Sequence, residues 1–325
     1  MLDRAGHCFQ AHIGLWVIEP LWAQQAVYQL NAGLWKTRPL EPTLRAYSER
    51  TAEEHCWHFQ SAAAGVRRED GQLFSRMDDT ALIRIVDQMT KAPSSLGMGT
   101  STILTRRAIR QAVADESIST ILLAIDSPGG MVAGTMELAD DVAQASLVKP
   151  VAAHIEDLGA SAAYWVASQA QRVTATRISQ VGSIGVVAEV IDAKGAADQQ
   201  GLVVHVVSTG DYKGLGAPGT EVTQAYLDEV KSLVEGIGRE FFGAVQRGRG
   251  LSDRQLTAAR TGQVWLAPQA LSMGLLDGIE SFDEAVSALA GMRKRRSRGA
   301  ARGESPSTQR VAAIRARLGT LTAEG

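Results

Sequence analysis

Short apolar stretches alternate with amphipathic ones from about residue 80 onward. Six apolar stretches rich in Val, Ile and Ala predict β-strands, at residues 81–86, 120–126, 150–156, 172–176, 183–191 and 202–208. Between the first four, apolar residues at helical spacing predict helices over residues 105–115, 134–146 and 161–170. This alternation predicts α/β layers with mostly parallel strands and right-handed crossovers. Ligands on such sheets usually bind beyond the carboxyl ends of the strands, so the loops there are the first candidates for chemistry.

The two ends of the chain lack this pattern. Residues 1–77 hold four of the six tryptophans with little periodicity, which predicts a separate docking segment ahead of a main domain at residues 78–290. Within that domain, residues 228–252 predict one long amphipathic helix. Residues 291–325 carry nine Lys and Arg residues against two acidic ones, which predicts a flexible basic tail.

The composition is that of a globular protein, because 45% of the 325 residues are hydrophobic and 21% are charged. A formal net charge of -2 gives no argument for nucleic acid or an acidic membrane surface as a partner. Cys8 and Cys56 are too few for a disulfide framework, and the zinc-binding side-chain types at residues 55–59 lack a fourth ligand. No apolar run is long enough to span a membrane, and the first ten residues lack the features of a leader. We therefore expect a soluble, cytoplasmic protein that needs no metal or organic cofactor.

Two loops after predicted strands have the composition of a reactive site. The loop at residues 126–130, Asp-Ser-Pro-Gly-Gly, can turn its N–H groups toward an oxyanion, although it is equally suited to an ordinary strand-to-helix turn. The next loop leads to Ser161, at the start of a predicted helix. Serine is a favoured N-cap, yet a helix N-terminus would also stabilise an alkoxide beside it. These residues alone leave both roles for Ser161 open.

A nucleophilic serine needs a base. His154 and His205 lie inside predicted strands and the other four histidines lie in the first 60 residues, so a Ser-His-Asp triad is a poor interpretation. Lys213 lies in a glycine-rich loop after the last predicted strand. Desolvation can bring a lysine pKa to ~7–8, where the neutral amine accepts a serine proton, and Ser183 could orient that amine. The alternative for Lys213 is an ordinary solvated loop lysine.

Five blocks along the chain carry a family resemblance: LLAIDSPGG, IEDLGASAAYWVAS, VGSIGV, VVSTGDYKGLGAPGT and LLDGIESFDEA. In this order and spacing they resemble the S49 peptidases, the serine proteases of the signal peptide peptidase A type. More closely, they resemble the phage and prophage members that act as procapsid maturation proteases or minor capsid proteins. The resemblance covers roughly residues 78–288.

The resemblance implies a fold and a site. The family fold is the ClpP/crotonase type, a β-α superhelical spiral that usually assembles into rings, and in some relatives neighbouring protomers share the catalytic dyad. Ser161 occupies the nucleophile position and Lys213 the general-base position of that dyad. The N–H groups of Gly130 and Ala162 correspond to the oxyanion hole, and Ser183 corresponds to the hydroxyl that orients the lysine.

The function that the resemblance implies is a serine endopeptidase with a Ser-Lys dyad. Its expected substrates are capsid, portal or scaffold proteins during procapsid maturation, in the host cytoplasm or the procapsid, with the basic tail as a tether and no need for nucleic acid. One alternative is a bacterial peptidase that degrades signal peptides or other small peptides. Another is a catalytically silent minor capsid protein or a crotonase-like CoA-binding enzyme, but the presence of Ser161, Ser183 and Lys213 together argues against both of these.

Overall fold

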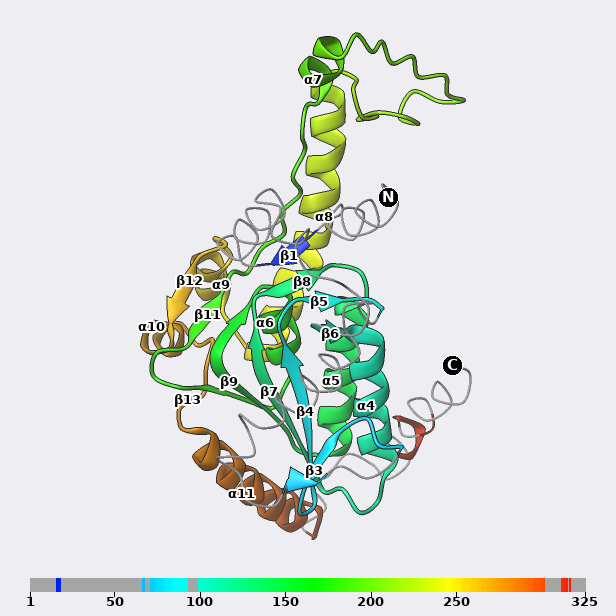
Figure 1. The fold of residues 1–325 in the computed structure, drawn as a ribbon. Coiled ribbons are helices and arrows are strands. Elements are labelled where there is room, and N and C mark those ends of the chain that lie inside the picture. The colour runs from blue at the N-terminus through cyan, green and yellow to red at the C-terminus, as the bar shows by residue number, and fades with distance from the viewer. Residues whose placement is uncertain are drawn as a thin grey trace, which may run out of the picture. The chain divides into compact units, whose positions relative to one another are not determined.

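A computed structural model describes residues 16–18, 66–67, 71–92, 99–301, 311–314 and 316 (Figure 1). The chain divides into two compact units. The smaller unit comprises Met1–Trp16 and Val186–Glu240, and the larger unit comprises Val17–Gly185 and Phe241–Gly325. Each unit is described by itself below.

The larger unit is built on a mostly parallel sheet, with the strand order β12-β11-β9-β7-β4-β3-β2 and with β10 and β13 paired beside β9. Strands β4, β7 and β9 are parallel, and β9 also pairs in parallel with β10 and β11. Antiparallel pairs β3–β4 and β11–β12 flank this core. The bounds are β2 Val66–Arg67, β3 Ser75–Met77, β4 Thr80–Val86, β7 Thr120–Ser127, β9 Val151–Ala160, β10 Arg172–Ala175, β11 Gln180–Gly182, β12 Val264–Leu266 and β13 Gly278–Ile279.

A second, smaller sheet has the strand order β1-β8-β5-β6. Its strands are β1 Trp16–Ile18, β5 Met89–Thr90, β6 Thr100–Ser101 and β8 Gly129–Met131. Strand β8 begins two residues after β7 ends, so the chain passes from the main sheet into the small one within the predicted Asp-Ser-Pro-Gly-Gly loop.

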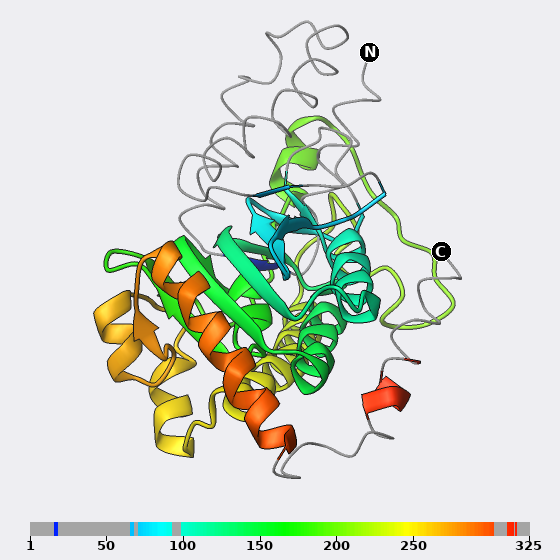
Figure 2. The ribbon, with the colours of Figure 1, turned by 90° about the horizontal axis from the view of Figure 1, so that it is seen from below.

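Helices cover both faces of the main sheet, as Figure 2 shows for α11 on one side and α4 and α5 on the other. The side chains of β4, β7 and β9 explain this, because both faces of these strands are apolar over most of their length. One face packs Leu82, Leu122 and Ala152 against Leu289 of α11. The helices are α4 Thr102–Ala114, α5 Thr135–Val148, α6 Ala162–Ala167, α7 Lys194–Gln199, α8 Gln224–Arg249, α9 Asp253–Ala259, α10 Ala267–Ser272 and α11 Phe282–Ala301.

The predicted α/β class with a mostly parallel sheet is confirmed, and so are the strands at 81–86, 120–126, 150–156 and 172–176. The predicted helices at 105–115, 134–146 and 161–170 correspond to α4, α5 and the shorter α6. The long helix predicted at 228–252 is also present, as α8.

Two predicted strands are wrong. The stretch 183–191 is not a strand, because β11 ends at Gly182 (φ 127°) and Ser183 (φ 51°) turns the backbone out of the extended conformation. The stretch 202–208 pairs with no strand in the described part of the chain, and its side chains are exposed, with Val207 97% accessible. An apolar sequence pattern predicts a strand only where a partner strand can receive its hydrogen bonds.

The two ends of the chain depart from expectation in detail. Strands β2 and β3 lie within the predicted N-terminal segment, yet they extend the main sheet. Helix α11 continues to Ala301, so residues 291–301 of the predicted flexible tail are helical. Of residues 1–77, only 16–18, 66–67 and 71–77 are described, so Cys8, Cys56 and residues 55–59 lie outside the described residues.

Candidate active site

Ser161 lies at the junction of β9 and α6, in a strained backbone conformation. Its φ of 55° and ψ of -122° fall in a region that residues with a side chain rarely adopt. Two backbone hydrogen bonds hold it there: its N–H donates to the Gly182 carbonyl at 2.8 Å, and its own carbonyl accepts the Trp165 N–H at 2.9 Å. Strain of this kind persists where the surroundings over-determine it, and it concentrates at functional sites.

The side chain of Ser161 does not cap the helix that it begins. No hydrogen bond runs from a backbone N–H of α6 to its hydroxyl. The residue is 1% exposed, and its Oγ is buried with no hydrogen-bond partner among the described residues. A buried hydroxyl without a partner is energetically costly, so its presence calls for an explanation other than folding stability.

Ser183 lies beside Ser161 because of the register of two parallel strands. Ala160 at the end of β9 is paired with Gly182 at the end of β11, so Ser161 and Ser183 are the residues that directly follow this pair. Ser183 is 4% exposed and has a φ of 51°, and its N–H donates to the Gln263 carbonyl at 2.7 Å. The structure therefore brings these two predicted site serines together.

Gly130 lies in β8, which α6 contacts. The preceding Ser127 is paired with Gly159, so the loop of residues 127–130 lies beside the end of β9 that leads into Ser161. A Cβ atom at Gly130 would lie 2.0 Å from the Met89 carbonyl oxygen, so the close approach of β5 requires glycine there.

Ala162 is the first residue of α6 and is fully buried. The first N–H groups of a helix have no partner within the helix, so the Ala162 N–H belongs to a set of donors that face outward from the helix start. Gly130 and Ala162 thus lie in β8 and at the start of α6, two elements that contact each other.

Lys213 belongs to the smaller unit. It lies in a turn in which its N–H donates to the Gly210 carbonyl at 3.0 Å, and the glycines that follow, Gly214 and Gly216, have positive φ angles. The residue is exposed. The turn therefore explains the glycines of this loop, independently of any role of Lys213.

The family model for peptidase family S49 matches residues 143–295. These residues are therefore similar to peptidase family S49. A Methanocaldococcus jannaschii protein, MJ0651, is 30% identical over 175 residues, which are 54% of this chain and 56% of that protein. Capsid assembly protease C of Escherichia phage lambda is 30% identical over 181 residues, 56% of this chain and 41% of that protein. Protease 4 of Haemophilus influenzae is 29% identical over 181 residues, 55% of this chain and 29% of that protein.

The predicted resemblance to S49 peptidases is thereby confirmed. The chain spans less than two thirds of the length of each of these three relatives. A solved structure of an enoyl-CoA hydratase/isomerase family member aligns over 79% of this chain and 88% of its own, with a TM-score of 0.41 and 14% identity. The S49 match contains Ser161, Ala162, Ser183 and Lys213, whereas Gly130 precedes it.

The described residues include neither a helix that could cross a membrane nor a cluster of metal-binding side chains. None of their helices combines the length and the apolar character that crossing a bilayer requires. Among the same residues, no group of three or more His, Cys, Asp and Glu side chains is arranged to hold a metal ion.

Sequence reasoning missed a carboxylate cluster beside the two loops. Arg84 is paired with Ala124, and Ala124 is paired with His154. Asp126 and Glu156 lie two residues further along β7 and β9, respectively. Burial raises the pKa of Glu156 to about 8, although Arg84 opposes the rise. Burial and then the Asp157 charge raise the pKa of Asp126. The signal in the sequence was an acidic residue at the end of each of two apolar strands, just before the reactive loops.

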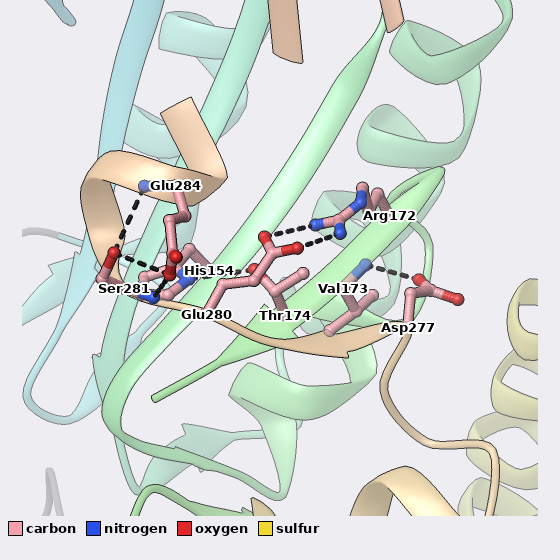
Figure 3. A network of polar contacts seen from close by, with 8 residues as sticks. All are labelled: His154, Arg172, Val173, Thr174, Asp277, Glu280, Ser281 and Glu284. Atoms are coloured by element: carbon pink, nitrogen blue, oxygen red, sulfur yellow. Dashed lines mark hydrogen bonds and ion pairs between the residues drawn. The ribbon is translucent and has the colours of Figure 1, made fainter. Parts of the chain in front are cut away.

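His154 lies on the face of the sheet that α11 covers and takes no part in this site. It is fully buried, its Nδ1 lies 2.9 Å from Thr174 Oγ1, and its ring meets Phe282 edge-on. Burial lowers the pKa of His154 to about 4. Its neighbours Arg172 and Glu280 form an ion pair, as Figure 3 shows. The histidine is thus a neutral core residue, consistent with the rejection of a Ser-His-Asp triad.

Polar contacts also fix the start of α11 (Figure 3). Ser281 and Glu284 form a reciprocal cap, in which the Glu284 carboxylate accepts the Ser281 N–H at 2.8 Å and the Ser281 Oγ accepts the Glu284 N–H at 3.3 Å. Asp277 accepts the Val173 N–H at 2.7 Å and pairs with Arg249. The Ser161 side chain takes part in none of these contacts.

Proposed function

We propose that the chain is a serine endopeptidase that uses a Ser161–Lys213 dyad. The observation that carries the proposal is the buried Ser161 hydroxyl, which has no hydrogen-bond partner among the described residues and sits on a strained backbone at a helix start. The match of residues 143–295 to peptidase family S49 supports the same role. A purely structural serine would use its hydroxyl as a cap or a buried hydrogen bond, and Ser161 does neither.

In the proposed reaction the neutral amine of Lys213 takes the proton of the Ser161 hydroxyl as Oγ attacks the carbonyl carbon of a peptide bond. The N–H groups of Gly130 and Ala162 hold the resulting oxyanion. Lys213 then gives its proton to the departing amine, which leaves an acyl-enzyme. Water, deprotonated by the same lysine, hydrolyses the ester and restores Ser161. Ser183 orients the Lys213 amine, and the steps need no metal or organic cofactor.

Assembly into a homo-oligomeric ring, with the dyad shared between protomers, is part of this proposal. A lysine becomes a base at neutral pH only when it is shielded from water, yet Lys213 is exposed in the single chain. The nearby segment also exposes apolar side chains: Leu202 55%, Val203 77%, Val206 46% and Val207 97%. A second copy that covers this segment would bury the apolar side chains and remove water from the lysine.

The proposed substrates are capsid, portal or scaffold proteins, processed during procapsid maturation in a host cytoplasm or procapsid. The relative from phage lambda is named for capsid assembly, which favours this substrate class. The basic residues 291–325 would tether the enzyme to scaffold or capsid protein. The alternative is a peptidase of a bacterial cell that degrades signal peptides or other peptides, favoured by the similarity to Protease 4.

A fluorophosphonate probe tests the chemistry without knowledge of the substrate. Serine attack on phosphorus forms a covalent bond to Oγ, fluoride leaves, and the base takes the proton. We expect intact-mass spectrometry to find one adduct at Ser161 that both Ser161→Ala and Lys213→Ala abolish. Ser168→Ala is the matched control, because Ser168 is also fully buried, but its hydroxyl is bonded to the Trp165 carbonyl.

Co-expression with capsid and scaffold proteins then tests the substrate class. Processing that Ser161→Ala and Lys213→Ala both prevent would support the capsid role. Labelling at Ser161 without any processing of these proteins would favour the cellular peptidase. An adduct that survives Ser161→Ala or Lys213→Ala would overturn the dyad.

A further inference from the structure

We propose that Ser127 is a positioning residue for the peptidase reaction proposed above. Its hydroxyl holds the loop that carries Gly130 in the conformation that presents a backbone N–H group to the oxyanion. The inference rests on the proposed function and names a residue that acts through the loop rather than on the substrate.

The Ser127 side chain joins two backbone groups. The residue is fully buried at the end of β7, and its Oγ donates to the Asp87 carbonyl at 2.5 Å. The same Oγ accepts the Gly129 N–H at 3.2 Å. Gly129 has a φ of 95°, so the loop turns sharply at the point where the hydroxyl holds it. One hydroxyl therefore links the turn to the neighbouring strand end.

Asp87, whose carbonyl accepts the Ser127 hydroxyl, is itself in an unusual backbone conformation. Asp87 follows β4 and has a φ of 53°, in the left-handed region. Its N–H donates to the Asp126 carbonyl at 3.0 Å. The Asp87 N–H thus donates to Asp126, and the Asp87 carbonyl accepts from Ser127. These two hydrogen bonds hold the carboxyl ends of β4 and β7 together.

The position of Gly130 follows from these contacts. Two residues after Asp87, Met89 is paired with Gly130 in the small sheet. The loop is therefore fixed at Asp126 and Ser127 on one side and at Gly130 on the other. Among these contacts, the two that the Ser127 hydroxyl makes involve a side chain, and the others join backbone groups. A substitution at Ser127 can therefore loosen the loop without removing any backbone group that pairs in it.

These contacts require a small side chain at position 127 that both donates and accepts a hydrogen bond. Ser127→Ala removes both bonds and leaves the Asp87 carbonyl and the Gly129 N–H without this partner. Ser127→Thr keeps the hydroxyl, whereas Ser127→Val has nearly the same shape as threonine but no hydroxyl. The Thr and Val variants therefore separate the loss of the hydroxyl from the effect of added volume.

A second hydroxyl contact between the same two strands supplies the control. At their amino ends, Thr80 Oγ1 and Thr120 Oγ1 lie 2.7 Å apart, and both residues are buried. Thr120→Val breaks a buried hydroxyl pair between β4 and β7 without touching the loop. A general loss of stability of this strand pair should appear in both Thr120→Val and Ser127→Ala, but a loss of loop positioning should appear only in Ser127→Ala.

The experiment measures the rate of fluorophosphonate labelling at Ser161, the kcat and KM for a cleaved peptide, and the affinity for a peptidyl boronate of the same sequence. For Ser127→Ala we expect labelling and kcat to fall about 10-fold or more, towards the ~10²- to 10³-fold loss seen when an oxyanion donor is removed. KM should change little, and boronate affinity should fall with kcat. The Ser127→Thr variant should be at least about 10-fold faster than Ser127→Val.

Equal rates for wild type, Ser127→Ala and Thr120→Val would overturn the positioning role while leaving the peptidase proposal intact. Equal rates for Ser127→Thr and Ser127→Val would also overturn it, even if Ser127→Ala failed to fold. A wild-type chain without any adduct at Ser161 would instead refute the proposed function, and this inference with it.

Discussion

The carbonyl of Gly182 accepts the backbone N–H of Ser161 at 2.8 Å, so the end of β11 holds the candidate nucleophile in its strained conformation. Gly182 has a φ of 127°, and a Cβ there would lie 2.6 Å from the Trp265 ring and 2.7 Å from the Gln263 carbonyl. Gln263 in turn accepts the N–H of Ser183. Gly182, the last residue of β11, therefore holds Ser161, and Gln263, the residue before β12, holds Ser183.

We predict that Gly182→Ala slows fluorophosphonate labelling of Ser161 by about 10-fold or more, because the alanine must displace the strand end that orients the serine. Labelling kinetics followed by intact mass measure this effect. Gly185→Ala is the control, since its Cβ would have 3.7 Å to the nearest atom and its φ is not positive. Equal labelling of the two variants would contradict the role of Gly182.

An aromatic stack holds helix α6 in place. The rings of Trp165 and Phe241 lie 4.6 Å apart and are nearly parallel, at 7°, and both residues are buried. Phe241→Ala should lower the free energy of unfolding by about 3–5 kcal/mol, the usual cost of such a core truncation. Phe242→Ala, at a neighbouring position that is less buried, should cost less. Urea denaturation of the three proteins measures the difference, and equal midpoints would refute this account of α6.

His154 should make the domain acid-sensitive. Its folded-state pKa of about 4 lies below the ordinary value of 6.5 because the ring is buried. Between these two pH values the histidine is protonated in the unfolded chain and neutral in the folded chain. The free energy of unfolding is therefore unaffected by this group above pH 6.5 and decreases as the pH drops toward 4. The slope from this group is at most ~1.4 kcal/mol per pH unit.

His154→Asn removes this titration and should flatten the pH dependence between pH 6.5 and 4. Urea unfolding at several pH values in that range measures the slope. His205→Asn is the control, because His205 is exposed. If the slope is the same in the His154 variant and wild type, the buried neutral histidine is not the cause of the acid sensitivity.

Glu156 should have the opposite effect at alkaline pH. Its folded-state pKa of about 8 lies above the ordinary 4.5, mainly because of burial. The favourable contribution of the protonated form is complete below pH 4.5 and is lost as the pH rises through 8. Glu156→Gln mimics the protonated carboxyl, so it should raise the Tm at pH 8.5 and change it little at pH 4.5. An exposed substitution on α8, Glu229→Gln, should show no such dependence. A Tm gain for Glu156→Gln that is equal at both pH values would refute the assignment.

Much of the fold could be predicted because local pattern and tertiary role agree in the core strands. The apolar stretches that became β4, β7 and β9 are buried by helices on both faces, so their composition alone predicted them. The candidate residues Ser161 and Ser183 were recognised from family blocks. Their closeness depends on the register Ala160–Gly182, which joins segments about 20 residues apart.

The failures share one physical cause, since a pattern of apolar residues does not say what will cover them. Residues 202–208 have the composition of a buried strand, but in the single chain they are exposed. The carboxylates Asp126 and Glu156 look like ordinary strand-end charges in the sequence. Only the pairing of β7 with β9 brings them together in a partly buried place where their pKa values rise.

The amino-acid sequence by itself determined the α/β class, the main parallel strands and the resemblance to S49 peptidases, because these follow from local periodicity and from short blocks of adjacent residues. The tertiary structure alone decided that the Ser161 hydroxyl has no partner within the described part of the chain and does not cap α6, and that the Ser127 hydroxyl joins Asp87 to Gly129. Hydrogen bonds between residues 40 positions apart depend on strand register and burial, and neither is encoded in any local stretch of the chain.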